Sequence, residues 1–132
     1  INGIIDLVTP LVLNLDLGYA AILIRNREWV RKRNMDIIMP NQETLKQLTK
    51  NLTEKTKVHY HEHMPIAYIE LKCQQTTGTT IAQELLTRDT LVIPGKYFGK
   101  DNGIRIGLAT TEPNQFKTAM ETITNTVNNQ CK

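Results

Sequence analysis

The chain has 132 residues, a length that fits one domain, and hydrophobic residues make up 40% of it. Its net charge of +3 is too small to indicate a nucleic-acid-binding protein, because such proteins gather Lys and Arg on one face. The sequence contains no serine, which excludes serine-nucleophile sites from this polypeptide. Cys73 and Cys131 lack the spacing of a metal or redox motif, so we expect reduced thiols and a cytoplasmic location.

The first predicted element is a helix over residues 11–38. The segment 1–24 is strongly apolar and a basic run over 25–33 follows it, an order that is typical of a membrane anchor. Asp6 and Asp16 would each cost roughly 2.5–3.5 kcal/mol at mid-bilayer, so we expect no membrane span. A helix that is apolar nearly all round must be buried, and we expect 1–24 to pack against another domain or subunit. The basic run is then its solvated continuation and no nucleic-acid patch.

The rest of the chain mixes short helices and strands. Pro40 is expected to break or kink the helical pattern, and Asn41 to cap a second helix. The further predicted elements are a helix over 42–52, strands over 58–62 and 66–71, a threonine-capped helix over 80–87, strands over 90–93 and 104–109, and a helix over 112–128 that opens with a hydroxyl cap and an early proline.

This order predicts an α+β (α/β) fold over residues 1–132, a single domain in which helices cover a small sheet of about four strands. Residues 1–38 form its long apolar connecting helix region, and residues 39–132 form the α/β sandwich.

The strand over 104–109 carries the candidate site. Ile104, Ile106 and Leu108 share one face, which is a core face, and Arg105 shares the other face with Gly107 and Ala109. These small neighbours leave space beside the guanidinium, whose planar fork can bind a carboxylate through two parallel hydrogen bonds. The strand pattern alone favours a solvent-exposed residue or a structural ion pair at Arg105.

The segment around Arg105 resembles the closing signature of class I/II (fold type I) pyridoxal-phosphate-dependent aminotransferases. It reads Pro94-Gly95, then Phe98-Gly99, then Ile-Arg-Ile-Gly-Leu-Ala over residues 104–109, with a helix after it. The weaker likeness upstream extends the resemblance to residues 11–127. It implies the C-terminal small domain of an enzyme that transfers an amino group between an amino acid and a 2-oxo acid.

In that family, the arginine at the position of Arg105 binds the α-carboxylate of the substrate. The loop that here contains Pro94, Gly95, Phe98 and Gly99 packs near the substrate pocket. No segment of this chain resembles the family's cofactor lysine site, and no lysine lies in an apolar context. The resemblance therefore implies that a large domain outside this chain binds pyridoxal phosphate, that this chain holds no catalytic residue and is inactive alone, and that the full enzyme is a homodimer.

Two other hypotheses follow from the residues themselves. His59, His61 and His63 alternate, so a regular strand would place all three on one face, a spacing that some zinc sites use. A zinc site needs a further ligand and supporting hydrogen bonds, and we predict a solvent-facing edge in its place. The alternative function is a free-standing α+β module that binds a small carboxylate or a protein partner and uses residues 1–24 to form oligomers.

Overall fold

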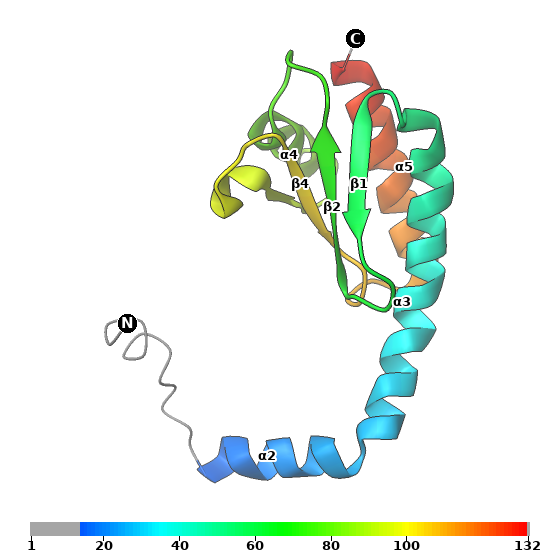
Figure 1. Cartoon of the computed structure of the whole chain (residues 1–132), viewed down its shortest axis with the longest axis vertical. Helices are drawn as coiled ribbons and strands as arrows, with labels where there is room; N and C mark the ends of the chain where they lie inside the picture. Colours follow the sequence, from blue (N-terminus) through cyan, green and yellow to red (C-terminus); the bar gives the residue numbers. More distant parts are fainter. Residues whose placement is uncertain (1–13, 132) are drawn as a thin grey trace. The chain divides into compact units, whose positions relative to one another are not determined.

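The computed structural model describes residues 14–131, with side chains from Asp16 onward (Figure 1). Residues 1–13, which belong to the predicted apolar segment, lie outside this range. The chain divides into two compact units after Arg33. No helix within the described range is long and apolar enough to cross a membrane.

The first unit contains α2 (Asn14–Arg25) and the start of α3 (Arg27–Thr49). The single helix predicted over 11–38 is interrupted at Asn26, whose backbone N–H and side-chain amide both donate to the carbonyl of Ile22, at 3.0 and 2.8 Å. The large apolar side chains of α2 are between 54% and 66% exposed, and they are Leu17, Tyr19, Ile22, Leu23 and Ile24. The described part of the chain leaves them uncovered.

The expectation of two separate helices on either side of Pro40 is wrong. The helix α3 continues through Pro40 to Thr49 and is followed by the 3-10 turn η1 (Lys50–Leu52). A proline removes the hydrogen bond to the carbonyl four residues earlier, which belongs to Asp36. Asp36 and Pro40 both lie on the exposed side of the helix, where water can reach that carbonyl.

Asn41 is also not the predicted helix cap. Its side chain is fully buried, and its amide nitrogen donates to the carbonyls of Leu108 at 2.9 Å and Thr111 at 2.8 Å. This asparagine therefore joins α3 to the loop after the last strand. A cap signal and a tertiary hydrogen-bonding role use the same residue type, which is why the sequence pattern was ambiguous.

The second unit is built on a sheet of four antiparallel strands, which confirms the predicted α+β class. Their order is β1-β2-β4-β3, and they are β1 (Thr56–Tyr60), β2 (Ile66–Leu71), β3 (Ile93–Pro94) and β4 (Gly103–Gly107). The strand β2 has the predicted bounds. The strand β1 starts and ends two residues before its predicted range, β4 ends two residues before its own, and β3 shares only Ile93 with the range predicted for it.

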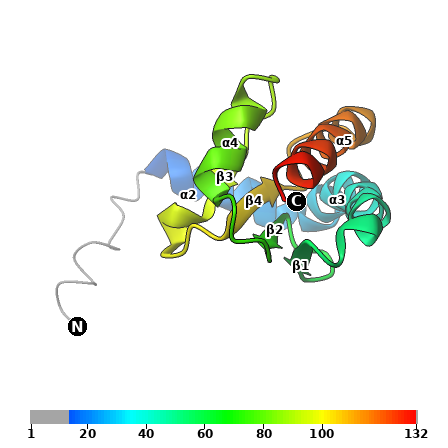
Figure 2. The same ribbon diagram turned by 90° about the horizontal axis from the view of Figure 1, so that it is seen from above.

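Helices cover one face of this sheet. Figure 2 shows α4 (Gly78–Leu86), α5 (Pro113–Gln130) and α3 along one side of the strands. The buried core comes from that face and from these helices, and it includes Leu45, Ile69, Ile81, Leu85, Ile104, Leu108, Met120 and Val127. The opposite face has no helix of the second unit over it, and there β2 alternates three exposed or half-buried residues with three buried ones.

The helix ends agree with the sequence in part. Thr77 caps α4, because its side chain accepts a hydrogen bond from the N–H of Thr80 at 3.2 Å. Pro113 lies in the first turn of α5, as predicted. The predicted hydroxyl cap of α5 is wrong, since Glu112 occupies the cap position and makes no side-chain cap bond.

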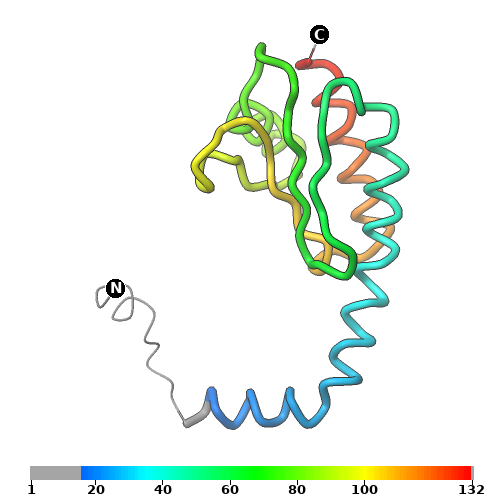
Figure 3. Tube along the Cα trace, viewed as in Figure 1, coloured from blue at the N-terminus to red at the C-terminus, as the bar shows by residue number. Residues whose placement is uncertain are grey.

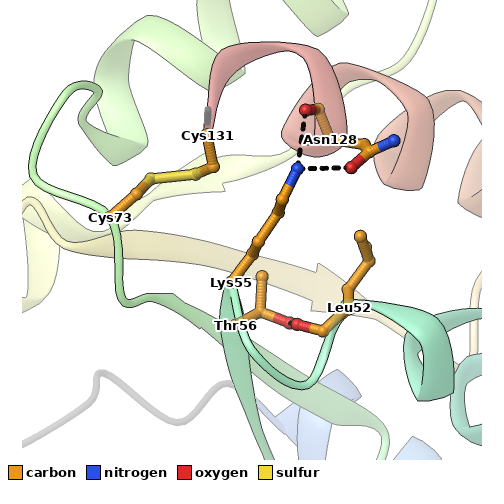
Figure 4. Close-up of a disulfide and its surroundings, with 6 residues drawn as sticks. All are labelled: Leu52, Lys55, Thr56, Cys73, Asn128 and Cys131. Carbon is orange, nitrogen blue, oxygen red and sulfur yellow. Dashed lines mark hydrogen bonds between the residues drawn. A yellow bond between two sulfur atoms is a disulfide. The ribbon is translucent and has the colours of Figure 1, made fainter.

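A disulfide joins Cys73, which follows β2, to Cys131 at the end of α5, so the expectation of reduced thiols is wrong (Figure 4). The trace brings the end of α5 next to the chain that leaves β2 (Figure 3). Lys55 adds a second link, since its Nζ donates to the carbonyl and the side-chain oxygen of Asn128 at 3.1 and 2.6 Å. Disulfides are rare in cytosolic proteins, so this bond does not support the predicted cytoplasmic location, which stays a prediction.

We predict that reduction of the disulfide lowers the free energy of unfolding by about 4 kcal/mol, because the bond closes a long loop in the unfolded chain. The two cysteines are separated by 58 residues in the sequence. Urea denaturation with and without dithiothreitol measures the change. A variant with both Cys73→Ser and Cys131→Ser serves as control and should not respond to the reductant. Equal urea midpoints for the unaltered chain in both conditions would contradict the disulfide.

Asn41→Ala should lower the free energy of unfolding by about 2–3 kcal/mol, since it leaves two carbonyls without their donor. Asn125→Ala, at an exposed position of α5, is the matched control and should change stability little. Thermal or urea unfolding of both variants provides the comparison. Similar stabilities for the two would show that the buried amide does not hold α3 to the loop.

Candidate functional site

The open face of the sheet carries a row of three side chains from three neighbouring strands. His59 of β1 lies opposite Tyr68 of β2, and Tyr68 lies opposite Arg105 of β4. Directly opposed residues of antiparallel strands project to the same face. Because Ile104 and Ile106 are buried in the core, alternation along β4 puts Arg105 on the open face.

The guanidinium of Arg105 is accessible and lies against an aromatic ring. The residue is half-buried, and its Cζ lies 5.2 Å from the centre of the Phe98 ring, within the range of a cation–π contact. Arg105 forms no ion pair with any residue in the range 14–131, so the structural ion pair that its strand pattern also allows is not found there. Gly107 is exposed on the same strand, and a Cβ there would meet only the hydroxyl of Thr110, at 3.3 Å.

The loop between β3 and β4 presents Phe98 to Arg105. It forms the 3-10 turn η2 (Gly95–Phe98) and then Gly99, whose φ of 89° lies in the left-handed region that favours glycine. Gly95 requires the absence of a side chain for a different reason. A Cβ at this buried position would overlap the carbonyl of Lys100 and the hydroxyl of Tyr68. Both glycines therefore shape the turn from which the Phe98 ring projects.

These elements surround an open cavity of about 540 Å³. Its wall comes from β1, the turn after β1, β2, η2 and β4, and the lining residues are Val58, His59, Tyr60, His61, Met64, Ile66, Ala67, Tyr68, Phe98 and Arg105. Of the residues proposed from the sequence, Arg105 and Phe98 meet here. Gly95 and Gly99 line an adjoining hollow beside Lys100, and Pro94 pairs with Ile104 on β4. A concave, mostly apolar site with a few polar groups is the usual form of a small-molecule pocket.

A chain of hydrogen bonds connects Tyr68 and His59 of the cavity wall through Asn102 and Glu70, which line the adjoining hollow. The hydroxyl of Tyr68 donates to Oδ1 of Asn102 at 3.0 Å, and Nδ2 of Asn102 donates to Oε1 of Glu70 at 2.9 Å. The other oxygen of Glu70 lies 2.7 Å from Nε2 of His59. These three hydrogen bonds hold His59 and Tyr68 at the cavity wall. Sequence reasoning missed Tyr68 and Glu70, although their alternation on the strand 66–71 could have placed both on one face.

Two residues in this chain of hydrogen bonds, Glu70 and Tyr68, have shifted pKa values. The hydrogen bond from His59 holds the pKa of Glu70 below its ordinary value of 4.5. Burial raises the pKa of Tyr68 above 10.0, and the nearby carboxylates of Glu70 and Asp101 add to the effect. Glu70 is therefore ionised and Tyr68 neutral at pH 7.

The three histidines do not lie on one regular strand, so that part of the sequence prediction is wrong. The strand β1 ends at Tyr60, and His63 has a φ of 64°, which turns the chain. The amide of Gln42 donates to the carbonyls of His61 and Met64, at 2.9 and 3.3 Å, and so holds this turn against α3. Among the described residues, no group of three His, Cys, Asp or Glu side chains could hold a metal ion.

The lysines do not fit pyridoxal phosphate. A lysine that forms a Schiff base with this cofactor needs an apolar or otherwise pKa-lowering environment. Lys55 is half-buried and bonded to Asn128, and the other lysines between residues 14 and 131 are exposed. The described residues therefore place an accessible arginine at an open cavity, and none of the described lysines lies in such an environment.

Comparisons with known proteins give the fold. No protein-family model matches the chain, and no curated protein matches it. A pyridoxal-phosphate-dependent aminotransferase from Streptococcus suis 89-1591 is similar over 99% of this chain, with a TM-score of 0.73 and 19% identity. An archaeal alanine:glyoxylate aminotransferase is similar over 71%, with a TM-score of 0.62 and 15% identity.

A third similar structure is LysN, the α-aminoadipate aminotransferase from Thermus thermophilus in complex with N-(5'-phosphopyridoxyl)-L-leucine, which matches over 83% of this chain with a TM-score of 0.68 and 14% identity. This chain covers 34%, 24% and 29% of the three solved chains, respectively. The chain therefore has the fold of one part of these aminotransferases, about a third of their length or less.

We predict that His59→Ala raises the pKa of Glu70 back toward 4.5, because the hydrogen bond from His59 is the main cause of its low value. A carboxyl ¹³C NMR titration measures it. The stabilisation from ionised Glu70 is fully present above pH 4.5 and is lost as the pH falls through the lower folded value. In the variant the folded and unfolded pKa values of Glu70 nearly coincide, so Glu70 should add little to the pH dependence of stability. His61→Ala, whose ring does not bond Glu70, is the control. A Glu70 pKa that stays low in His59→Ala rules out this cause.

Proposed function

We propose that this chain is the C-terminal small domain of a class I/II pyridoxal-phosphate-dependent aminotransferase, and that Arg105 binds the α-carboxylate of the amino-acid substrate. One observation carries the proposal: the guanidinium of Arg105 lines an open cavity and has no acidic partner in the described chain. The signature over residues 94–109 and the shared fold support it.

The geometry around Arg105 suits a carboxylate. A guanidinium binds a carboxylate through two parallel hydrogen bonds in one plane, so the orientation of that plane orients the ligand. The ring of Phe98 lies 5.2 Å from Cζ and restricts the plane. The contribution of this chain to the reaction is then to bind the substrate and hold it in one orientation, which lowers the barrier by positioning.

The chemistry of the cofactor belongs to a large domain outside the described residues. Pyridoxal phosphate supplies an electron sink when it is bound. No lysine between residues 14 and 131 lies in a suitable environment, so we propose that this chain alone is inactive and that its part in catalysis requires the large domain.

The exposed apolar side chains of α2 support a place within a larger assembly. Five large apolar residues within residues 17–24 are more than half exposed in the described chain, and exposed apolar side chains concentrated on one short helix are typical of an interaction site. We propose that residues 1–24 pack against the large domain or against the second subunit of a homodimer.

In the longer protein, Arg105→Ala should raise the KM for the amino donor about 10- to 100-fold, which corresponds to the loss of a charged hydrogen-bonded pair of roughly 1.4–2.8 kcal/mol. Arg105→Lys should recover only part of the loss, since lysine lacks the planar fork. Arg88→Ala, which removes an exposed arginine paired with Glu84 on α4, is the matched control and should leave KM unchanged. Steady-state kinetics over a range of donor concentrations separates KM from kcat.

An unchanged KM in Arg105→Ala would refute the assignment of Arg105. The chain alone, mixed with pyridoxal phosphate and an amino acid, should show no cofactor band beyond that of the free reagents. If the reading frame before Ile1 encodes no lysine-bearing domain and the chain forms a stable oligomer, the alternative of a free-standing carboxylate-binding or oligomerisation module takes the place of the enzyme hypothesis.

A further inference from the structure

Apolar side chains that reach solvent gather around Arg105. Tyr60, Met64, Ile66 and Phe98 are between 37% and 54% exposed, and all four line the same cavity. Large apolar side chains scattered singly over a surface are ordinary, whereas a concave group of them beside a charged residue is typical of a ligand pocket. A ligand that fits this cavity therefore has an apolar part.

The charges of the cavity wall are unequal. Arg105 is the permanent cation among the lining residues, and no Asp or Glu is among them. The Nε2 atom of His59 is already held by the carboxylate of Glu70 at 2.7 Å. One carboxylate on the ligand satisfies Arg105, and the wall offers no second Lys or Arg for another acid group.

Two other substrate classes fit this wall poorly. A second carboxylate at the far end of a substrate would lose water without gaining a Lys or Arg partner among the lining residues, which is costly. A terminal ammonium or guanidinium group would find no carboxylate among the lining residues and would share the cavity with Arg105. A neutral, apolar side chain meets neither cost, and it gains by leaving water.

We propose that this cavity is a specificity pocket for amino acids with a single carboxylate and an apolar or aromatic side chain. The proposal rests on the proposed function of Arg105 and adds the substrate class. Arg105 takes the carboxylate and Phe98 restricts the guanidinium plane. Ile66 and Met64, at the hairpin end of the sheet, contact the side chain of the substrate.

The test uses three small probes with the 132-residue chain in its ¹⁵N-labelled form. They are 3-phenylpropanoate, which has one carboxylate and an apolar end; succinate, which has two carboxylates; and n-butylamine, which has an ammonium group on an apolar chain and no carboxylate. We expect saturable shifts of the amides of residues 58–68 and of Arg105 with 3-phenylpropanoate, and about 5-fold weaker binding of succinate. Butylamine should cause no saturable shift at these amides.

Two pairs of variants assign the contacts. Ile66→Ala should weaken the binding of 3-phenylpropanoate about 3- to 10-fold and leave the binding of succinate unchanged, because only 3-phenylpropanoate buries apolar surface at Ile66. Leu91→Ala removes an equally apolar side chain that is 84% exposed and lies outside the cavity. This control should leave the affinity for both probes unchanged. Phe98→Ala should weaken the binding of both 3-phenylpropanoate and succinate. Tyr97 is the aromatic neighbour of Phe98 in η2 and lies outside the cavity wall, so Tyr97→Ala should leave the binding of both unchanged.

The outcomes separate this inference from the function it rests on. If succinate binds as tightly as 3-phenylpropanoate and Arg105→Ala abolishes both, the apolar class is overturned while the carboxylate role of Arg105 stands. If 3-phenylpropanoate binds Arg105→Ala as well as it binds the unaltered chain, the anchoring role fails and this inference fails with it. The absence of saturable shifts with any probe at millimolar concentration also overturns the pocket.

Discussion

The pairing of β2 with β4 is the constraint on which the site depends. In this register Tyr68 faces Arg105 and Ile69 faces Ile104, so one face of the pair is entirely core and the other is free. A slip of one residue would turn Arg105 into the core and an isoleucine out to solvent, so burial of the isoleucines fixes the register strongly. The position of the guanidinium is thus a consequence of apolar packing on the opposite face.

Close backbone contacts hold the surrounding elements to this pair. Gly78 lies where any side chain would overlap the carbonyl of Gly103, so the start of α4 packs directly on the strand that carries Arg105. Gly95 leaves room in the same way for the hydroxyl of Tyr68. The turn η2, the helix α4 and the central strands therefore pack closely through their backbones, and this packing places the turn that carries Phe98 beside Arg105.

The two ends of the β1–β2 hairpin differ in character. Thr56 pairs with Leu71 at one end, where the disulfide follows Leu71 and Lys55 bonds to α5. The cavity lies toward the other end, where exposed apolar and histidine side chains surround the turn. Covalent and polar links thus stabilise the end far from the cavity. At the cavity end the structure leaves apolar surface exposed, as expected where a ligand or a further domain binds.

The sequence by itself determined the class of fold, the bounds of β2, and the outward direction of Arg105, since a period of two in isoleucines allows only one buried face. It also determined a threonine cap for α4 and the early proline of α5, because these signals act within a few residues, although α4 starts two residues before its predicted range. Only the tertiary structure decided the continuation of α3 through Pro40, the buried bonds of Asn41 and the disulfide between Cys73 and Cys131. Each of these depends on a partner or on solvent exposure that no local pattern records, and the same is true of the contact between Phe98 and Arg105.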